Sequence, residues 1–201
     1  MVTTIGVLAL QGAFALHLQA IERLAAAGLA VRGVPVKTAA ELADVDALIM
    51  PGGESTTMSM LLDSQQLFAP LQAAIDDGLP VFGTCAGMIL LASDILDGRD
   101  DQNCFGALDI KVRRNAYGAQ VESFETDLAV SVLDEPFPAV FIRAPGVETV
   151  GGGVDVVSEH RGEPVLCRSG AVLASSFHPE LTDDDRLHRY FLESVVGVAA
   201  V

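Results

Sequence analysis

The segment that decides how this chain is expected to fold reads Leu79-Pro80-Val81-Phe82-Gly83-Thr84-Cys85-Ala86-Gly87-Met88-Ile89. Its first residues are apolar, as in a buried strand, and its last residues begin a helical pattern. Between them lies Gly-x-Cys-x-Gly, which is a nucleophile elbow with cysteine in place of serine. Gly83 and Gly87 leave room where a strand turns sharply into a helix. The segment therefore predicts a strand–turn–helix unit that presents Cys85.

The chain before this segment alternates between strand and helix patterns. Short apolar or β-branched runs are separated by stretches with helical periodicity. The expected strands are Ile5–Leu10, Leu29–Val34, Val45–Met50 and Leu79–Phe82, and the expected helices are Gly12–Ala27, Thr56–Leu62, Leu67–Asp76 and Ala86–Leu96. This alternation predicts an α/β fold of the flavodoxin-like type, with a doubly wound, mostly parallel sheet and helices on both faces.

The pattern changes after Gly98, where shorter runs are separated by turn residues. The runs are Leu108–Val112, Gln120–Phe124, Ala139–Ile142, Val154–Ser158, Val165–Arg168 and Val172–Ser176, and a closing helix is expected over Asp183–Val196. We expect these runs to form antiparallel hairpins added to the same sheet. Residues 1–201 are therefore expected to form a single domain.

Charge and cysteine content narrow the classes of partner. The 201 residues include 27 acidic and 12 basic side chains, giving a formal net charge of −15. Such a surface repels phosphate backbones and anionic lipids, so neither nucleic acid nor a membrane is expected as a partner.

Cys85, Cys104 and Cys167 are too few and too scattered for a disulfide framework or a cysteine-rich metal site. A reducing cytoplasmic setting, with no metal, is expected.

The position of Cys85 favours a catalytic role. It stands at the carboxyl end of a strand, where open α/β sheets bind their ligands. The helix that follows favours a negatively charged thiolate, and the N–H of Ala86 is placed to donate to an oxyanion. The alternative is a buried structural cysteine, which is how we interpret Cys104 and Cys167. The flanking glycines favour the nucleophile for Cys85.

A histidine and a carboxylate follow the last expected strand, in Ser175-Ser176-Phe177-His178-Pro179-Glu180. Residues two apart in extended chain face the same way, so Glu180 can accept from one imidazole nitrogen of His178 while the other faces a thiol. Alone, such a histidine is more often structural; together with the elbow, it predicts a Cys–His–carboxylate triad. The other histidines, His17, His160 and His188, have no evident partner, and we expect them at the surface.

A second glycine turn, Pro51-Gly52-Gly53-Glu54-Ser55, follows the third expected strand. As turn chemistry alone, the glycines allow positive φ, and Glu54 and Ser55 suit a helix N-terminus. The turn is also expected at the same sheet edge as Cys85, where the N–H of Gly53 can complete an oxyanion hole. The nearby end of the first strand, Gln11-Gly12, is expected beside it.

These motifs together resemble the class I, or triad, glutamine amidotransferases. The resemblance is carried by Pro51–Ser55, Gly83–Gly87 and Phe177–Glu180. Further segments are similar to the glutaminase subunits of pyridoxal 5'-phosphate synthase: Gly6-Val7-Leu8-Ala9-Leu10-Gln11-Gly12, Arg114-Asn115-Ala116-Tyr117-Gly118 and Phe141-Ile142-Arg143-Ala144-Pro145. The motifs extend from the first strand to the last helix and occur in the family's order.

The resemblance implies a reaction and a partner. Cys85 would attack the side-chain amide of L-glutamine, ammonia would leave, and water would release L-glutamate from a thioester. The ammonia would pass to a separate ring-building synthase subunit that makes the vitamin B6 ring, and no cofactor is expected in this chain. The residues implied to hold glutamine are Gly53, Glu54, Ser55, Arg114, Ile142 and Arg143. An arginine suits an α-carboxylate and Glu54 an α-ammonium, but which side chain meets which end stays open.

One departure from the family pattern and three alternatives remain. A basic residue is expected where this chain has Ala119, which affects a contact near the site rim or the partner face. The chain could instead serve another synthase or be a cysteine hydrolase of the DJ-1/PfpI type. A non-enzymatic alternative is a flavodoxin-like binding module in which Cys85 only packs.

Overall fold

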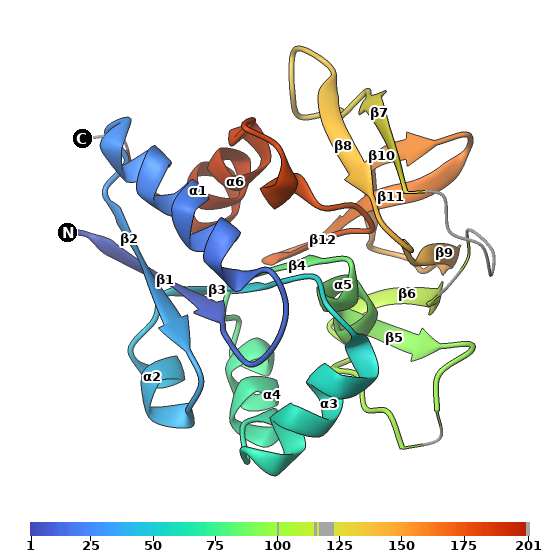
Figure 1. Cartoon of the computed structure of the whole chain (residues 1–201), viewed down its shortest axis with the longest axis horizontal. Helices are drawn as coiled ribbons and strands as arrows, with labels where there is room; N and C mark the ends of the chain where they lie inside the picture. Colours follow the sequence, from blue (N-terminus) through green and yellow to red (C-terminus); the bar gives the residue numbers. More distant parts are fainter. Residues whose placement is uncertain (100, 115, 117–122, 200–201) are drawn as a thin grey trace.

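A seven-stranded sheet forms the centre of the computed structural model, which describes residues 1–99, 101–114, 116 and 123–199. The strand order is β10-β11-β12-β4-β3-β1-β2 (Figure 1). Five strands run parallel: β1 (Thr3–Leu8), β2 (Val31–Val36), β3 (Ala47–Met50), β4 (Val81–Thr84) and β12 (Val172–Ser175). The hairpin of β10 (Asp155–His160) and β11 (Glu163–Ser169) adds antiparallel strands beside β12. The expected fold class is confirmed.

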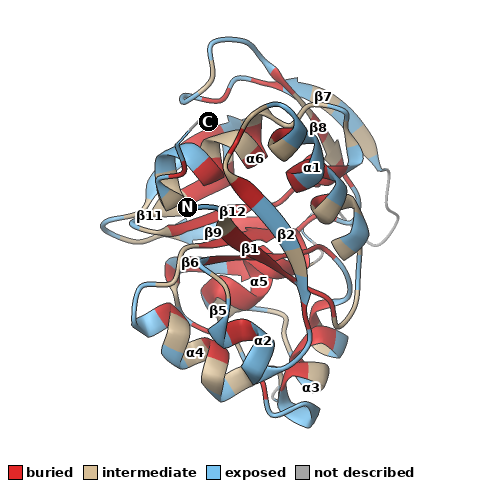
Figure 2. Cartoon of the chain, turned by 90° about the vertical axis from the view of Figure 1, so that its left-hand side faces the viewer, coloured by how far each residue is buried: buried red, intermediate tan, exposed pale blue. Residues whose placement is uncertain are grey.

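Helices cover both faces of this sheet. One face carries α1 (Phe14–Ala26) and α6 (Arg186–Tyr190), which continues as a π-helical segment, Phe191–Val196. The other carries α2 (Ala39–Ala43), α3 (Ser55–Ser64), α4 (Phe68–Asp76) and α5 (Ala86–Leu91). Successive strand side chains enter opposite layers, so Leu48 and Met50 belong to one apolar cluster and Ile49 to the other. Figure 2 shows buried strands beneath helices with exposed outer surfaces.

Two smaller sheets correct the expectation that all later strands extend the main sheet. One consists of β5 (Ala92–Ile95), β6 (Leu108–Arg113) and β9 (Gly146–Val150), and the other of β7 (Phe124–Leu128) and β8 (Phe137–Phe141). The helix expected over Ala86–Leu96 ends at Leu91, because the next four residues pair with β6. Tertiary pairing here overrides local helical periodicity. The expected strand Gln120–Phe124 falls outside the described residues except at its end.

Three neighbouring strands end at the same edge of the sheet. In the parallel register, Met50 of β3 lies beside Gly83 of β4, and Thr84 lies beside Ser175 of β12. The turns that follow these strands therefore meet, as expected for the carboxyl edge of an open α/β sheet. Within the described residues, no helix combines the length and the apolar character needed to cross a membrane.

Candidate active site

Cys85 occupies a strained turn between β4 and α5. Its backbone has φ 50° and ψ −102°, a conformation that residues with a side chain rarely adopt. The N–H of Cys85 donates to the carbonyl of Ser175 at 2.8 Å, which ties the turn to β12. A Cβ atom on Gly87 would lie 2.2 Å from the carbonyl oxygen of Met50, so only glycine allows this close approach. The surrounding packing therefore holds the cysteine in place.

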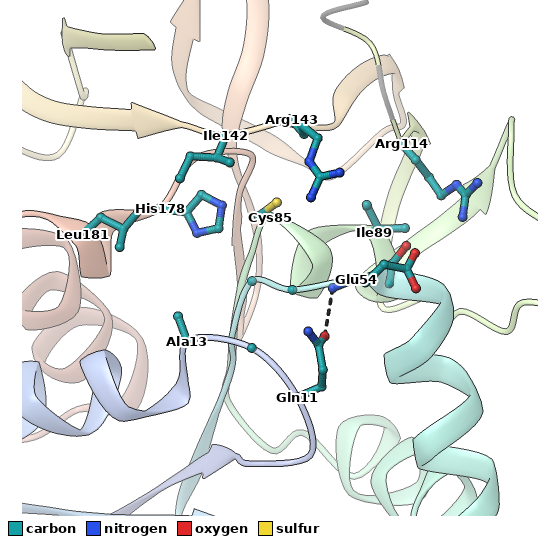
Figure 3. A pocket seen from close by; sticks show the side chains of 14 residues that line it. Gln11, Ala13, Glu54, Cys85, Ile89, Arg114, Ile142, Arg143, His178 and Leu181 are labelled. Carbon is teal, nitrogen blue, oxygen red and sulfur yellow. Dashed lines mark hydrogen bonds between the residues drawn. The ribbon is translucent and has the colours of Figure 1, made fainter. Parts of the chain in front are cut away.

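His178 and Glu180 lie in the loop after β12. The N–H of His178 donates to the carbonyl of Val140 in β8 at 2.9 Å, and its imidazole Nδ1 lies 2.8 Å from Glu180 Oε1. Glu180 belongs to the short 3₁₀ turn Pro179–Leu181 and is 4% exposed. Figure 3 shows the imidazole of His178 next to Cys85. The structure thus brings the three predicted triad residues together.

The pKa shifts of His178 and Glu180 favour a charged imidazolium and a charged carboxylate at neutral pH. Burial is the largest influence on His178 and alone lowers its pKa, but hydrogen bonds and charges from Cys85 and Glu180 outweigh it and raise the pKa to about 10. Burial alone raises the pKa of Glu180, but the hydrogen bond from His178 and electrostatic interactions with His17 and His178 lower it overall. An imidazolium beside the thiol and an ionised carboxylate behind it result, which is the arrangement that stabilises an attacking thiolate.

A cavity of about 520 Å³ opens in front of Cys85 and His178. This volume suits a small-molecule ligand. Its lining includes every residue that the resemblance assigns to glutamine, namely Gly53, Glu54, Ser55, Arg114, Ile142 and Arg143. Glu180 and Ala86 are buried and do not line it. Further lining residues are Gln11, Gly12, Ala13, Gly52, Ile89 and Leu181.

The glycine turn after β3 packs directly against the triad. A Cβ atom on Gly52 would lie 2.3 Å from Cε1 of His178 and 3.3 Å from Cβ of Cys85. The turn is also joined to the loop before α1, as expected from the sequence. The N–H of Glu54 donates to Oε1 of Gln11 at 2.8 Å, drawn as a dashed line in Figure 3, and Ala13 donates to the Gly52 carbonyl at 3.3 Å.

Opposite charges face each other at the other end of the cavity. Glu54 caps α3 by accepting from the N–H groups of Thr56 and Thr57 at 3.3 and 2.7 Å. Burial alone raises its pKa, but hydrogen bonds from Thr57 and Thr56 lower it overall. Arg114 lies nearby (Figure 3), and its Nη1 donates to Oγ1 of Thr56 at 2.6 Å and to Oε1 of Gln102 at 3.2 Å. The buried Nε of Arg114 has no partner among the described residues.

Arg143 and Ile142 reach the cavity from the end of β8. Arg143 has φ 44°, and Figure 3 shows its guanidinium extending toward the cavity near Cys85. Ile142 and Leu181 are 36% and 40% exposed. Part of the motif that begins at Arg114 lies outside the described residues, namely Asn115, Tyr117 and Gly118, and so does Ala119 after it. The expected effect of Ala119 therefore stays a prediction.

Two histidines lie in the core and not at the surface, so this prediction was wrong. His17 and His188 were expected at the surface, but both are 0% exposed, and Nδ1 of His17 lies 2.9 Å from Nε2 of His188. The signal was the helical spacing of His17 with Ala20, Ile21 and Leu24, which are the buried residues of α1. His160 is partly buried and lies against Phe124 and Phe141.

Gln102 also escaped notice, although it joins two of the predicted glutamine-binding residues. Its Nε2 donates to Oγ of Ser55 at 3.0 Å, while its Oε1 accepts from Arg114.

The cysteines interpreted as structural differ from Cys85 in their surroundings. Cys167 is buried in β11, and this burial raises its pKa to about 12, which leaves the thiol unreactive.

Comparison with known proteins supports the same chemistry. The sequence profile of the SNO glutamine amidotransferase family matches residues 7–197. The pyridoxal 5'-phosphate synthase subunit PdxT of Corynebacterium jeikeium is 56% identical over 95% of this chain and 96% of its own length. The protein of the same name from Bacillus licheniformis is 50% identical over 96% of this chain and 94% of its own length.

Solved structures agree with these sequence relationships. One crystal structure of a glutamine amidotransferase is 48% identical and matches with a TM-score of 0.88 over 96% of this chain and 99% of that chain. PurLQS from Thermotoga maritima, at 16% identity, has a TM-score of 0.72 over 96% of this chain and 99% of that chain, and shares the fold alone. Given the profile match over nearly its whole length, the chain belongs to the SNO glutamine amidotransferase family.

Proposed function

We propose that the chain is the glutaminase subunit of a pyridoxal 5'-phosphate synthase. It hydrolyses L-glutamine to L-glutamate and ammonia and delivers the ammonia to a ring-building subunit for vitamin B6 synthesis. The observation that carries the proposal is one cavity that joins Cys85 and His178 to the opposite charges of Glu54 and Arg114. The similar proteins named as subunits of pyridoxal 5'-phosphate synthase support this destination of the ammonia.

The first half of the reaction forms a thioester. The thiolate of Cys85 attacks the side-chain amide carbon of glutamine, so a C–S bond forms and the carbonyl oxygen becomes an oxyanion. We assign the N–H groups of Ala86 and Gly53 to this oxyanion. His178 carries a proton at neutral pH, since its pKa is raised to about 10 by Cys85 and Glu180 against the opposing effect of burial. It gives this proton to the departing nitrogen as the C–N bond breaks, and ammonia leaves.

The second half releases glutamate. Water attacks the thioester carbon while neutral His178 accepts its proton, and the C–S bond then breaks. The products are glutamate and the restored pair of Cys85 thiolate and His178 imidazolium. Glu180 keeps the imidazole oriented through the 2.8 Å contact between Oε1 and Nδ1 in both halves.

Charge complementarity makes glutamine the fitting substrate. The α-ammonium pairs with the ionised Glu54, and the α-carboxylate pairs with Arg114 and Arg143. The buried Nε of Arg114 has no partner among the residues that the structure describes. This supports the assignment, because a buried donor is normally satisfied and a substrate carboxylate would satisfy it. A cysteine hydrolase or a binding module would have no use for paired charges placed across the cavity from an activated thiol.

The cellular setting follows from the thiol chemistry. All three cysteines are free. A thiolate nucleophile works where thiols stay reduced, so the cytoplasm is the proposed location.

The test follows nitrogen from glutamine. The purified chain and its ring-building subunit are supplied with amide-¹⁵N glutamine and the sugar phosphates, and ¹⁵N is measured in pyridoxal phosphate and in free ammonia. Label in pyridoxal phosphate is the expected result. Label found only in ammonia would remove the proposed partner but keep the glutaminase, and no label in either would remove the glutaminase as well.

A further inference from the structure

A buried line of polar groups continues behind the triad. Glu180 uses Oε1 for His178, while its Oε2 has no hydrogen bond within the described part of the chain. This second oxygen lies 3.5 Å from Nε2 of His17 on α1. His17 in turn lies 2.9 Å, Nδ1 to Nε2, from His188 on α6. The side chains of His17 and Glu180 are both 0% exposed.

At 2.9 Å, Nδ1 of His17 and Nε2 of His188 share a hydrogen bond, so one of these two nitrogen atoms carries a proton and the other accepts it. The surrounding groups decide which ring is the donor. If Nδ1 of His17 carried the proton, the bare lone pair of Nε2 would face the Glu180 carboxylate at 3.5 Å. Two electron-rich atoms facing each other in a buried site repel strongly. With the proton on Nε2, His17 instead directs a donor at Oε2 and accepts from His188 through Nδ1.

The far side of His188 supports the same arrangement. Nδ1 of His188 is buried and has no hydrogen-bond partner within the described residues. If His188 accepted from His17 through Nε2, a neutral ring would have to carry its own proton on Nδ1, leaving a buried N–H without an acceptor. Unpartnered buried N–H groups are rarer in proteins than unpartnered acceptors. Both rings are therefore protonated on Nε2.

The two imidazoles are neutral donors rather than counter-charges. Burial is the largest cause that lowers the pKa of His17; Glu180 acts in the opposite direction, and His178 adds to the lowering. For His188, burial and then His17 lower the pKa to about 3, with Glu180 opposing and Arg23 contributing. These are the charged groups that face the pair, from α1 and from the loop after β12. A neutral donor can hold Glu180 without drawing its charge away from His178.

Resting on the proposed glutaminase function, we infer that His17 is a positioning residue that directs its Nε2 proton at Oε2 of Glu180, 3.5 Å away, and holds this carboxylate against His178. His188 sets the tautomer of His17. Oγ1 of Thr84, the residue before the nucleophile, lies 3.4 Å from the same Nε2 and shares the donor. Because Ala13, at the start of α1, also donates to the Gly52 carbonyl, this helix supports both the triad and the glycine turn.

The first test compares His17→Phe, which removes the donor and keeps an apolar ring, with His17→Gln, whose amide nitrogen can reach the position of Nε2. A hydrogen bond to a charged group is worth about 1.5–3 kcal/mol, so kcat of His17→Phe should fall at least tenfold while KM changes less than twofold. His17→Gln should recover most of this loss. His160→Gln is the matched control, because His160 lies outside the buried line, and it should match wild type.

The pH dependence of kcat separates positioning from simple packing. A loosened Glu180 supports the His178 imidazolium less well, so the alkaline limb of the profile should move to lower pH in His17→Phe and return in His17→Gln. A packing role would lower the melting temperature without moving this limb. The inference would be overturned if His17→Phe kept a kcat within twofold of wild type and an alkaline limb at the wild-type pH within experimental error.

A second measurement decides the matter even if His17→Phe does not fold. Nitrogen-15 NMR of the wild-type chain labelled at histidine should show neutral rings protonated on Nε2 for both His17 and His188. A proton on Nδ1 of His17 would overturn the inference. If wild type released no ammonia from glutamine, the proposed function would fail, whereas the NMR result would still decide whether His17 directs a protonated Nε2 at Glu180.

Discussion

The two ends of the cavity are built differently. At the reacting end, Cys85 and His178 follow strands of the central sheet, and their backbones are hydrogen-bonded to Ser175 and Val140. Their charges are balanced within the protein by Glu180. At the recognition end, the charged groups come from the start of α3 and from loops after strands of the two small sheets. They are Glu54, Arg114 and Arg143.

This difference separates turnover from binding. In the proposed reaction, the central sheet holds Cys85 and His178 in place before a substrate arrives, which is the condition for transition-state stabilisation. The recognition end keeps opposite charges and an Nε on Arg114 that has no partner in the described part of the chain, and a bound amino acid would complete both. Substitutions at the reacting end should therefore lower kcat, and substitutions at the recognition end should raise KM.

The strongest test of the reacting end is Cys85→Ala. Glutaminase turnover should fall by about 10⁴-fold or more, because Cys85 is the only thiol among the described residues that line the cavity. The ammonia release rate and the melting temperature measure activity and folding together. Cys104→Ala is the control, since Cys104 does not line the cavity and should be dispensable. A tenth of wild-type turnover in Cys85→Ala would remove the nucleophile assignment.

The next largest effects concern the proton carrier and the group that orients it. His178→Ala should lower kcat by about 10³–10⁴-fold, nearly as much as loss of the nucleophile. Glu180→Gln should be milder, because it misorients the imidazole without removing it. Both changes should leave KM for glutamine close to wild type. An unchanged kcat in Glu180→Gln would replace the triad by a Cys85–His178 dyad.

A steric change at Gly52 should damage the reacting end without removing any functional group. Its new Cβ in Gly52→Ala would lie 2.3 Å from Cε1 and 2.8 Å from Nδ1 of His178, so the imidazole must move. A displacement of about 1 Å can cost about 10² in rate, and a loss of that order in kcat is expected. Gly152→Ala is the matched control, since no atom of the described residues lies within 4 Å of its new Cβ. Equal kcat values in Gly52→Ala and Gly152→Ala would show that the glycine turn shifts to make room for the new Cβ and leaves His178 in place.

The recognition end should respond in KM instead. Arg114→Met removes the charge and keeps most of the side-chain length, so the substrate carboxylate loses a charge-assisted hydrogen bond. Such a bond is worth about 1.5–3 kcal/mol, and KM for glutamine should rise about 10- to 100-fold with little change in kcat. Propionamide, which lacks both charges, should be a far worse substrate than glutamine for wild type. Similar kcat/KM values for the two amides would contradict recognition by charge.

The two ends also differ in how far the sequence could predict them. The elbow, the triad and the four N-terminal parallel strands follow from local patterns: a glycine-flanked cysteine, a His-x-Glu pair and apolar runs bounded by turns. Their meeting at one sheet edge follows from parallel topology. The short strand Ala92–Ile95 could not be foreseen, because its residues continue the helical pattern of α5 and pair instead with β6.

The burial of the histidines and the role of Gln102 were not predicted from the sequence, for different reasons. His17 was expected at the surface because it had no evident partner, whereas its helical spacing with Ala20 and Ile21 places it on the buried face of α1. Gln102 is separated by 47 residues from Ser55 and by 12 from Arg114, so no short pattern could join them. Hydrogen bonds between distant loops depend on the assembled fold, which is why the recognition end is less predictable than the reacting end.

Gln102 provides the finest test of the comparison, because it touches the recognition end without facing the cavity. Its Oε1 accepts from Nη1 of Arg114 and from Oγ1 of Thr56, at 3.2 and 3.1 Å. In Gln102→Ala, Arg114 keeps its 2.6 Å hydrogen bond to Thr56, so its guanidinium becomes more mobile but stays at the cavity. The loss of about 1 kcal/mol predicts a KM about fivefold higher at unchanged kcat. Gln72→Ala is the control: Gln72 donates to the carbonyl of Phe105 but does not line the cavity, so its loss should leave KM at the wild-type value. Equal KM in both variants would mean that Arg114 is positioned by Thr56 alone, and a lower kcat in Gln102→Ala would mean that the two ends of the cavity are not independent.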